Sequence, residues 1–319
     1  MESVEAAARR RPSRKLRGKP STTWPTSLTV SQTRGIPVPE LPEVEVLRRD
    51  LEQEVVGKRI KDIVVRPGTN AMKIIPKHGR RREFQDMLAG AKIEKVERIG
   101  KRLLLDLDNA HVLIINLGHS GRVVKTSASQ TILPHTHIVA NFTIGGQLRI
   151  IDPRLTSEVR ITSDVEPETL RKELRDFDID PLEDHFTWNS FSAILESKDT
   201  GLKDILEDES FIVGLGHLYS DEILWQAGLR FDRSSRHLSS QDVRRLYRAL
   251  MELLQDVVKA RGTSWGDDAF VDLLGNPGQF QLELKVWEQE GEACRRCRST
   301  IVREPWGDAF TYLCAQCQS

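Results

Sequence analysis

The stretch CRRCRSTIVREPWGDAFTYLCAQC, residues 294–317, contains all four cysteines of this 319-residue chain. The spacing Cys294-x2-Cys297-x16-Cys314-x2-Cys317 is in the range typical of a four-thiolate zinc site. Two short pairs separated by the length of a β-hairpin can place four sulfurs tetrahedrally around one ion. Two disulfides or four independent thiols are the alternatives. The chain lacks the apolar core of a secretory signal, so we expect reduced thiols and a structural Zn²⁺ ion.

The region before the cysteines is predicted to be helical. Apolar residues recur at three- and four-residue intervals, most clearly from Leu246 to Val257, and Ser239 with Asp242 is a plausible helix cap. A glycine-rich loop at 262–278 follows, and we then expect a strand at 280–287. The predicted helices cover residues 188–197, 202–207, 219–227 and 240–260.

The first half of the body is predicted to be one helix followed by short strands. Pro42 suits the first turn of a helix whose apolar stripe runs from Val44 to Val55 and which ends at Gly57. Turn signals then separate several β-like runs, a pattern that favours an antiparallel sandwich. Residues 164–182 are predicted to be a linker. The clearest runs are 60–65, 102–108, 112–117, 138–144 and 148–151.

Charge is distributed unevenly along the chain. The net charge is zero, but residues 1–38 hold eight Lys/Arg against two Glu, a net +6, which leaves −6 on residues 39–319. A nucleic-acid-binding protein normally has a basic surface, so charge alone argues weakly against a DNA partner. Residues 1–38 show no helical or strand period and are predicted to be an unstructured extension. No run of eighteen apolar residues exists, which excludes a membrane helix.

Several motifs resemble the formamidopyrimidine-DNA glycosylase family. The first is Pro-Glu-Leu-Pro-Glu-Val-Glu at residues 39–45, which is similar to the mature N-terminus of those enzymes. The others follow in family order up to the terminal Cys-x2-Cys-Gln, so the resemblance covers nearly all of residues 39–318. They are Arg98–Lys101, Leu117–Gly121, His135–His137, Asp152–Arg154, Asp180–Leu182 and Gly214–Glu222.

The resemblance implies an α+β multidomain fold and damaged double-stranded DNA as the partner. It implies a β-sandwich domain at 39–165, a linker and helix-two-turn-helix domain at 166–280 and a zinc-finger domain at 281–319. It also implies base flipping, excision of an oxidised base and strand scission at the abasic site. We expect a monomer in the cytoplasm of a bacterium, associated with the nucleoid.

The resemblance also assigns the catalytic residues. Pro39 matches the N-terminal proline whose amine attacks the sugar, and Glu40 matches the general acid, which needs a raised pKa to hold a proton near neutral pH. Lys101 matches a hairpin lysine that assists ring opening and contacts phosphate. Glu43 is a second candidate acid.

Pro39 conflicts with the chain as written, because Val38 acylates it and an amide nitrogen cannot attack. Three explanations are open: translation that starts at a valine codon for Val38, a protease that cuts after Val38, or an inactive protein. We favour the first, in which residues 1–38 come from an overextended gene start. A basic arm with phosphate affinity and a transit peptide are the other interpretations of this segment.

Four residues match or lie near DNA-binding positions of the family. His135 and Arg154 match positions that hold phosphates, and a guanidinium suits that role. His217 lies in the Gly-x-Gly-His loop of the helix-two-turn-helix. Lys203 precedes that loop on a helix and is a candidate for a backbone contact, although an ordinary surface lysine is an equal alternative.

Four positions depart from the family pattern. His217 replaces an Asn, and Ala309 replaces the zinc-finger arginine that assists the last elimination step, which puts δ-elimination in doubt. His119 replaces a Met and Thr156 replaces a Phe among the residues that fill the gap left by the flipped base. The departures predict altered lesion recognition. They also leave room for two other functions, a non-catalytic binder of damaged or abasic DNA and a zinc-ribbon protein that binds another nucleic acid.

Overall fold

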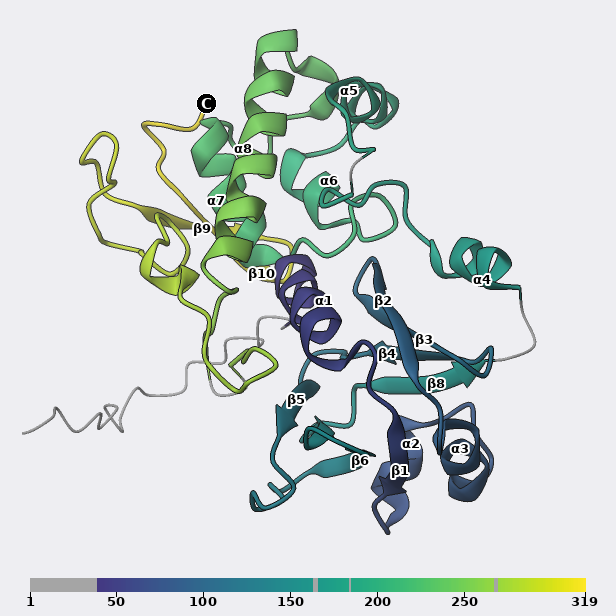
Figure 1. Ribbon diagram of the computed structural model, residues 1–319. Coiled ribbons are helices and arrows are strands. Elements are labelled where there is room, and N and C mark those ends of the chain that lie inside the picture. Colours follow the sequence, from purple (N-terminus) through teal and green to yellow (C-terminus); the bar gives the residue numbers. More distant parts are fainter. Residues whose placement is uncertain (1–38, 163–165, 184, 267–268) are drawn as a thin grey trace, which may run out of the picture. The chain divides into compact units, whose positions relative to one another are not determined.

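Helix α1 (Leu41–Val55) connects the two halves of the fold (Figure 1). The computed structural model describes residues 39–162, 166–183, 185–266 and 269–319, so the predicted extension at 1–38 lies outside the described residues. Pro42 lies in the first turn of α1, as predicted, and the buried stripe from Val44 to Val55 faces the interior. The helix contacts strands β2 (Ile93–Ile99) and β3 (Arg102–Leu107) and also helix α8 (Ser240–Lys259).

The N-terminal half is a β-sandwich, which confirms the predicted class. Two four-stranded antiparallel sheets have the orders β1-β6-β7-β5 and β2-β3-β4-β8, and side chains from both sheets share one core with α1. Helices α2 (Thr69–Ile74) and α3 (Arg81–Leu88) pack beside β6 and β1. The strands are β1 Ile60–Val65, β2 Ile93–Ile99, β3 Arg102–Leu107, β4 Val112–Asn116, β5 Arg122–Thr126, β6 Thr136–Phe142, β7 Gln147–Ile151 and β8 Glu158–Thr162.

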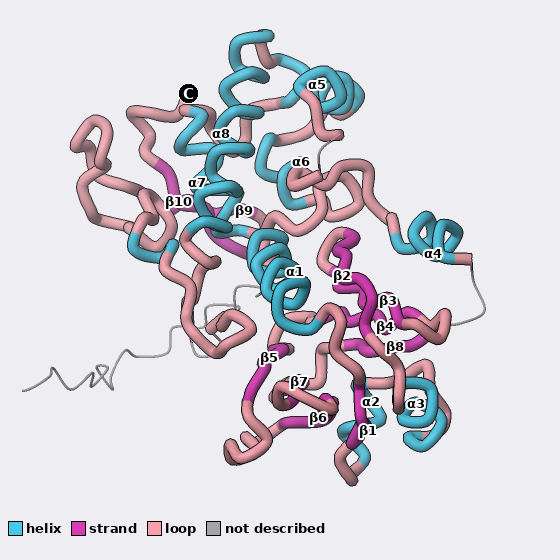
Figure 2. The backbone as a smooth tube through the Cα atoms, in the orientation of Figure 1, coloured by secondary structure: helices cyan, strands magenta, loops and turns pink. Residues whose placement is uncertain are grey.

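The second half is helical and closely follows the predicted segments. Helices α5 (Trp188–Ser197), α6 (Leu202–Glu207), α7 (His217–Ala227) and α8 (Ser240–Lys259) surround a second core (Figure 2). The Ser239 side chain caps α8 by accepting a hydrogen bond from the Asp242 N–H at 3.2 Å. A short 3₁₀ turn, η1, spans Ser235–His237. The segment predicted as a linker contains helix α4 (Pro167–Leu174), so that part of the prediction was wrong.

The strand predicted at 280–287 is absent. Residues Phe280–Leu282 form the 3₁₀ turn η2, and the chain then wraps around the buried carboxylate of Glu222. That carboxylate accepts the backbone N–H groups of three consecutive residues, Lys285, Val286 and Trp287, at 2.8–3.0 Å. A backbone whose donors are committed to one side chain cannot use them to pair with a strand. The apolar pattern here therefore reflects packing against the helical core.

The cysteine-rich end contains the hairpin expected between the cysteine pairs. Strands β9 (Val302–Trp306) and β10 (Ala309–Leu313) pair antiparallel, and Leu313 belongs to the same core as α7 and α8. All the described residues form a single compact unit. The domain boundaries predicted at residues 165 and 280 therefore remain a proposal. Among the helices of the described ranges, none is long and apolar enough to span a membrane.

Candidate active site

Pro39 and Glu40 lie at the start of α1, beside a cavity of about 600 Å³. Pro39 is buried and lines this cavity. Much of the remaining lining comes from the β2–β3 turn, the end of β4 and the loop after it, the segment between β7 and β8, and the segment before α7. The residues are Lys101, Asn116, His119, Thr156 and Glu209, among others. The fold thus brings two of the sequence-predicted residues, Pro39 and Lys101, to one cavity, and the third, Glu40, is buried next to Pro39.

Glu40 is held in a nearly dry environment. Its side chain is 4% exposed, and its Oε2 accepts one hydrogen bond, from the Gly216 N–H at 2.8 Å. Oε1 is buried and has no hydrogen-bond partner within the described chain. Burial, followed by the neighbouring carboxylate of Glu43, raises the pKa of Glu40 well above its ordinary value, although the Gly216 N–H opposes the shift. A carboxyl group in this setting can hold a proton and deliver it, which is the property that the predicted role requires.

Two glycines allow the loop before α7 to approach α1. A Cβ on Gly216 would lie 2.2 Å from Glu40 Oε1, and one on Gly214, which has a φ of +72°, would lie 2.7 Å from the Leu41 Cβ. The Leu41 N–H also donates to the Gly214 carbonyl at 3.0 Å. These glycines therefore let the loop before α7 pack directly against the start of α1.

Glu43 supports this arrangement from inside the protein. It accepts hydrogen bonds from the Tyr219 hydroxyl and, at 2.8 Å, from the Thr263 N–H, and it receives the Glu40 N–H at 3.2 Å. Burial raises the pKa of Glu43, while these donors lower it. The side chain is 2% exposed, so Glu43 is placed to position Glu40 and is remote from the cavity surface. If Glu43 takes part as a second acid, as the sequence suggested, it must therefore act through Glu40.

Lys101 lies in the turn between β2 and β3, and its ammonium group forms an ion pair with Glu209 from the opposite side of the cavity. The next residue, Arg102, pairs in the same way with Asp176, through contacts of 2.9 and 2.6 Å. Both acids come from the helical half. Lys101 and Arg102 are thus both paired with carboxylates across the cavity lining.

The positions expected to fill the gap left by a flipped base also lie at the cavity. His119 and Thr156 are both exposed, and Thr156 Oγ1 accepts the backbone N–H groups of His119 and Ser120 at 3.0 and 3.2 Å. Arg154 is exposed two residues before Thr156, and His135 is exposed with a φ of +59°. The cavity edge therefore carries polar side chains where the resemblance predicts larger ones.

Lys203 is not where the sequence led us to expect it. Its side chain is 0% exposed, and its Nζ donates to Ser220 at 2.8 Å, forms an ion pair with Glu207 at 2.9 Å and a second one with Asp221. A buried ammonium whose donors are all used in this way has no access to a DNA phosphate. The direct contact that we had predicted for Lys203 is therefore corrected to an internal role between α6 and α7.

His217 is the first residue of α7, and its side chain is 32% exposed. Its Nδ1 lies 2.5 Å from the Oε2 of Glu207. Its ring packs edge-on against Trp306 of the β9–β10 hairpin, with ring centroids 5.3 Å apart. Neither neighbour was suggested by the sequence, because Glu207 and Trp306 meet His217 only through the tertiary fold.

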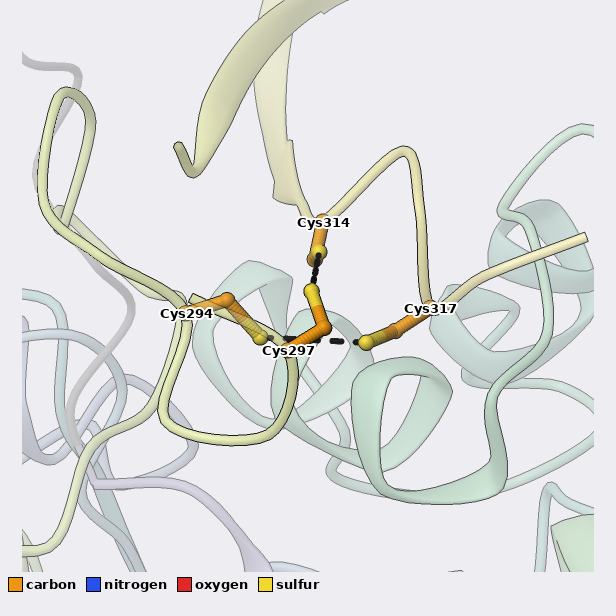
Figure 3. A group of neighbouring side chains, drawn as sticks. All are labelled: Cys294, Cys297, Cys314 and Cys317. Carbon is orange, nitrogen blue, oxygen red and sulfur yellow. Dashed lines mark hydrogen bonds between the residues drawn. The ribbon is translucent and has the colours of Figure 1, made fainter. Parts of the chain in front are cut away.

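The four cysteines converge as their spacing predicted (Figure 3). Their sulfur atoms all lie within 4.8 Å of one another, with Cys294 Sγ 3.8 Å from Cys317 Sγ and Cys297 Sγ 3.4 Å from Cys314 Sγ. None of the four forms a disulfide, which removes one of the two alternatives. Four free thiols at this separation can bind one metal ion.

Comparisons with known proteins agree with this arrangement. Residues 38–159 match the formamidopyrimidine-DNA glycosylase N-terminal domain, and residues 177–268 match the formamidopyrimidine-DNA glycosylase H2TH domain. The formamidopyrimidine-DNA glycosylase of Pelotomaculum thermopropionicum is 34% identical over 284 residues, which are 88% of this chain and 99% of that protein. The one from Heliobacterium modesticaldum is 35% identical over 88% of this chain and 100% of its own length.

Solved structures give the same result. A complex of the Lactococcus lactis Fpg with DNA that contains an abasic site is similar with a TM-score of 0.76 and 27% identity, over 88% of this chain and 99% of that one. The MutM (Fpg) protein of Thermus thermophilus is similar with a TM-score of 0.74 and 30% identity, over 88% and 98% of the two chains. Together with the family matches, these similarities show that the chain belongs to the formamidopyrimidine-DNA glycosylase family.

Proposed function

We propose that the protein is a DNA glycosylase with abasic-site lyase activity, which excises oxidised bases of the formamidopyrimidine and 8-oxoguanine type from duplex DNA in base excision repair. The observation that carries the proposal is the buried Glu40 carboxyl group beside Pro39, at a cavity that Lys101 also lines. The family membership supports it, as do the neighbours solved with abasic-site DNA and with Fapy-dG DNA.

In the proposed first step, the Pro39 nitrogen forms a bond to C1′ of the damaged nucleotide while the bond from C1′ to the base breaks. The electron pair of that bond leaves with the base, and Glu40 supplies a proton to the departing base or to the ring oxygen of the sugar. As the sugar ring opens, the proton left on the Pro39 nitrogen passes to the ring oxygen and an iminium ion forms on Pro39. A base, water or the Glu40 carboxylate that has given up its proton, then removes a proton from C2′, and β-elimination releases the 3′ phosphate. When DNA binds, the ion pair between Lys101 and Glu209 breaks, and Lys101 then contacts phosphate and assists ring opening.

This chemistry requires a free amine on Pro39. A lone pair is available only when no peptide bond joins Pro39 to Val38, because the nitrogen of an acylated proline is a tertiary amide. We therefore propose that the active form begins at Pro39. If the bond from Val38 to Pro39 persists, Pro39 cannot attack the sugar, and the alternative function, a lesion-binding protein without lyase activity, is favoured.

His135, Arg154 and His217 form the proposed phosphate contacts. All three have exposed or partly exposed side chains, and they come from the segments before β6, after β7 and at the start of α7. Positive or proton-donating groups of this kind fix the register of a protein on duplex DNA without reading its sequence. Lys203 is left out of this group because it is buried.

Zn²⁺ is the proposed ligand of the four cysteines. Four sulfurs bound tetrahedrally at the usual zinc–sulfur distance lie about 3.8 Å apart, close to the separations in this structure. When bound, the ion supplies a structural crosslink with no part in the chemistry. Cys294 and Cys297 precede the β9–β10 hairpin and Cys314 and Cys317 follow it, so the ion would fix both ends of that hairpin.

Incision of labelled duplexes tests the proposal. The protein made to begin at Pro39 should cut a duplex with one 8-oxoguanine and a duplex with one abasic site, and should leave the undamaged duplex intact. We expect Lys101→Ala to lower incision by about tenfold or more, and the exposed Lys77→Ala to have no effect. Equal binding to all three duplexes without incision would contradict the proposal.

A further inference from the structure

Arg98, near the end of β2, joins three segments behind the cavity. Its side chain is 4% exposed and lies outside the cavity lining. Nε donates to Glu45 of α1 at 3.0 Å, and Nη2 donates to Asp180, between α4 and α5, at 3.1 Å. Nη1 donates to Asp180 as well and, at 2.9 Å, to the backbone carbonyl of Gly100. A planar guanidinium with several fixed N–H donors can serve all three partners at once.

The contact with the Gly100 carbonyl holds the turn that carries Lys101. That carbonyl and the Lys101 N–H belong to one planar peptide unit, so the orientation of this unit sets the direction in which the Lys101 side chain leaves the backbone. Gly100 has a φ of +53°, and a Cβ on it would lie 2.8 Å from the Phe177 ring and 3.0 Å from the Val213 side chain. The turn is therefore fixed from two sides, by close packing and by Arg98.

Asp180 connects Arg98 to another wall of the cavity. The Asp180 side chain is 0% exposed. The residue before it, Ile179, donates its N–H to the Phe211 carbonyl at 2.8 Å and accepts the Val213 N–H at 3.0 Å. Val213 in turn lines the cavity. The sequence motifs that contain Arg98 and Asp180 therefore meet, although 82 positions separate these two residues, and they link the β2–β3 turn to this wall.

We propose that Arg98 is a positioning residue of the lyase, which holds the ammonium group of Lys101 in register with the Pro39 nitrogen. The connection to Pro39 runs through Glu45, which lies in the second turn of α1, the helix that Pro39 and Glu40 precede. Arg98 itself touches no reacting atom, because it is buried outside the cavity. It therefore acts on the reaction only through Lys101. The inference rests on the proposed function, since it assumes that Lys101 takes part in the reaction.

Arg98→Lys tests the geometry without removing the charge. An ammonium group is a compact donor on a flexible stem, so it cannot reach Glu45, Asp180 and Gly100 together. The turn then loses one of its two holds, while the cluster keeps its positive charge. A neutral side chain would instead leave the buried carboxylate of Asp180 without its cation, which is strongly destabilising.

The test is single-turnover incision of a duplex with one abasic site by the protein that begins at Pro39, which contains the whole compact unit that the structure describes. At saturating protein, Arg98→Lys should lower the rate by about tenfold, because a small displacement of a catalytic group is costly, and the loss should not exceed that of Lys101→Ala. Kd for a tetrahydrofuran duplex should rise by at most about fivefold, the value of one exposed ion pair. Arg171→Lys is the matched control: α4 places this arginine against carboxylates of β2 and β3 at 2.8 and 2.9 Å, and the variant should cut at the wild-type rate.

A double-mutant cycle provides a second readout that a merely structural role would not change. In a Lys101→Ala background, Arg98→Lys should lower the rate by less than about twofold, whereas independent effects would multiply. Asp180→Asn, which leaves Arg98 paired with Glu45, repeats the cycle if a melting curve shows that Arg98→Lys does not fold. A loss that persists in full without Lys101 overturns the inference alone. A wild type that binds the abasic duplex but does not cut it overturns the proposed function and, with it, the inference.

Discussion

Two regions of the site, the sugar-chemistry region at the start of α1 and the recognition region at the cavity edge, differ in how firmly their residues are held. In the first, Glu40 and Glu43 are buried and joined by hydrogen bonds to the loop before α7, to Tyr219 and to Thr263. In the second, His119 and Thr156 are exposed. The first region keeps the residues that the family resemblance predicts, and the second departs from them.

The contrast follows from the cost of changing each residue. Replacing one member of a buried hydrogen-bond network leaves the others unsatisfied in a dry environment, at a cost of about 1–3 kcal/mol each. Replacing an exposed side chain at a DNA-binding surface changes affinity and selectivity, but water can hydrogen-bond to the polar groups that lose their partner. We therefore expect the chemistry at the sugar to be retained and the recognition of lesions to differ from that of family members with the usual residues.

Loss of the metal should have the largest effect, because the hairpin between the cysteine pairs packs against α7, the helix that begins at the proposed phosphate contact His217. Cys314→Ser, or removal of the ion with a chelator, should abolish measurable binding to abasic DNA and lower the melting temperature. Metal analysis of the purified protein should find one zinc per chain. Thr300→Ser, an exposed change in the same segment, is the control. Full binding by a zinc-free protein would show that the hairpin does not need the ion.

Glu40→Gln tests the sugar-chemistry region. The substitution preserves shape but removes the acid, and we expect excision of 8-oxoguanine to fall by about 10²–10⁴-fold while abasic-site binding is unchanged. Because burial raises the pKa of Glu40, the wild-type rate should persist above the ordinary pH range of a glutamic acid and then decline as the pH rises through the raised pKa. The exposed Glu94→Gln should behave as wild type. A pH profile that is the same with and without Glu40 would remove this residue from the mechanism.

Restoring larger side chains tests the recognition region. His119→Met combined with Thr156→Phe should increase base flipping by about tenfold, since stacking an aromatic ring on a base contributes about 1–3 kcal/mol. A fluorescent adenine analogue next to the lesion reports flipping. Thr156→Phe also removes the hydroxyl that accepts two backbone N–H groups, so it can disturb the loop itself. His119→Met alone is therefore the milder variant. Thr143→Phe, away from the cavity, is the control. Flipping by wild type that already equals that of family members with Met and Phe would contradict the idea.

Glu209→Gln should have the smallest effect. The ion pair between Lys101 and Glu209 is partly exposed, with the Glu209 side chain 56% accessible, so its loss is worth little in stability. Removing the carboxylate that competes with phosphate should tighten abasic-DNA binding by about two- to fivefold and steepen the salt slope by about 0.9. A fall in the rate at saturating DNA would instead mean that Glu209 positions Lys101 for catalysis.

Local patterns in the sequence predicted most of the secondary structure. The cysteine spacing, the stripe on α1 and the four helices from residue 188 to residue 260 were predicted correctly, because each is set by residues close in sequence. The strand predicted at 280–287 was wrong because Glu222, more than sixty positions away, takes its backbone donors. Short strands such as β2, in which adjacent pairs of charged residues separate the apolar ones and break the alternation, were missed.

The site was less predictable than the fold. Pro39, Glu40 and Lys101 were found only because their motifs resemble a family; the structure brings Pro39 and Lys101 to one cavity and buries Glu40 next to Pro39. The burial of Lys203 and the pairing of His217 with Glu207 could not be foreseen, since both depend on how α6 packs against α7. Long-range charge pairing leaves no periodic trace in a single sequence.

The central claim is that Pro39 acts through a free amine, and borohydride trapping on a duplex with one abasic site tests it most directly. The protein made to begin at Pro39 should give a covalent protein–DNA band with reductant and none without it. The full 319-residue chain should give none, because its Pro39 nitrogen is acylated. Tight binding without a covalent band at any concentration of the protein that begins at Pro39 would contradict the claim. The protein would then be a lesion-binding member of the family that has lost its chemistry.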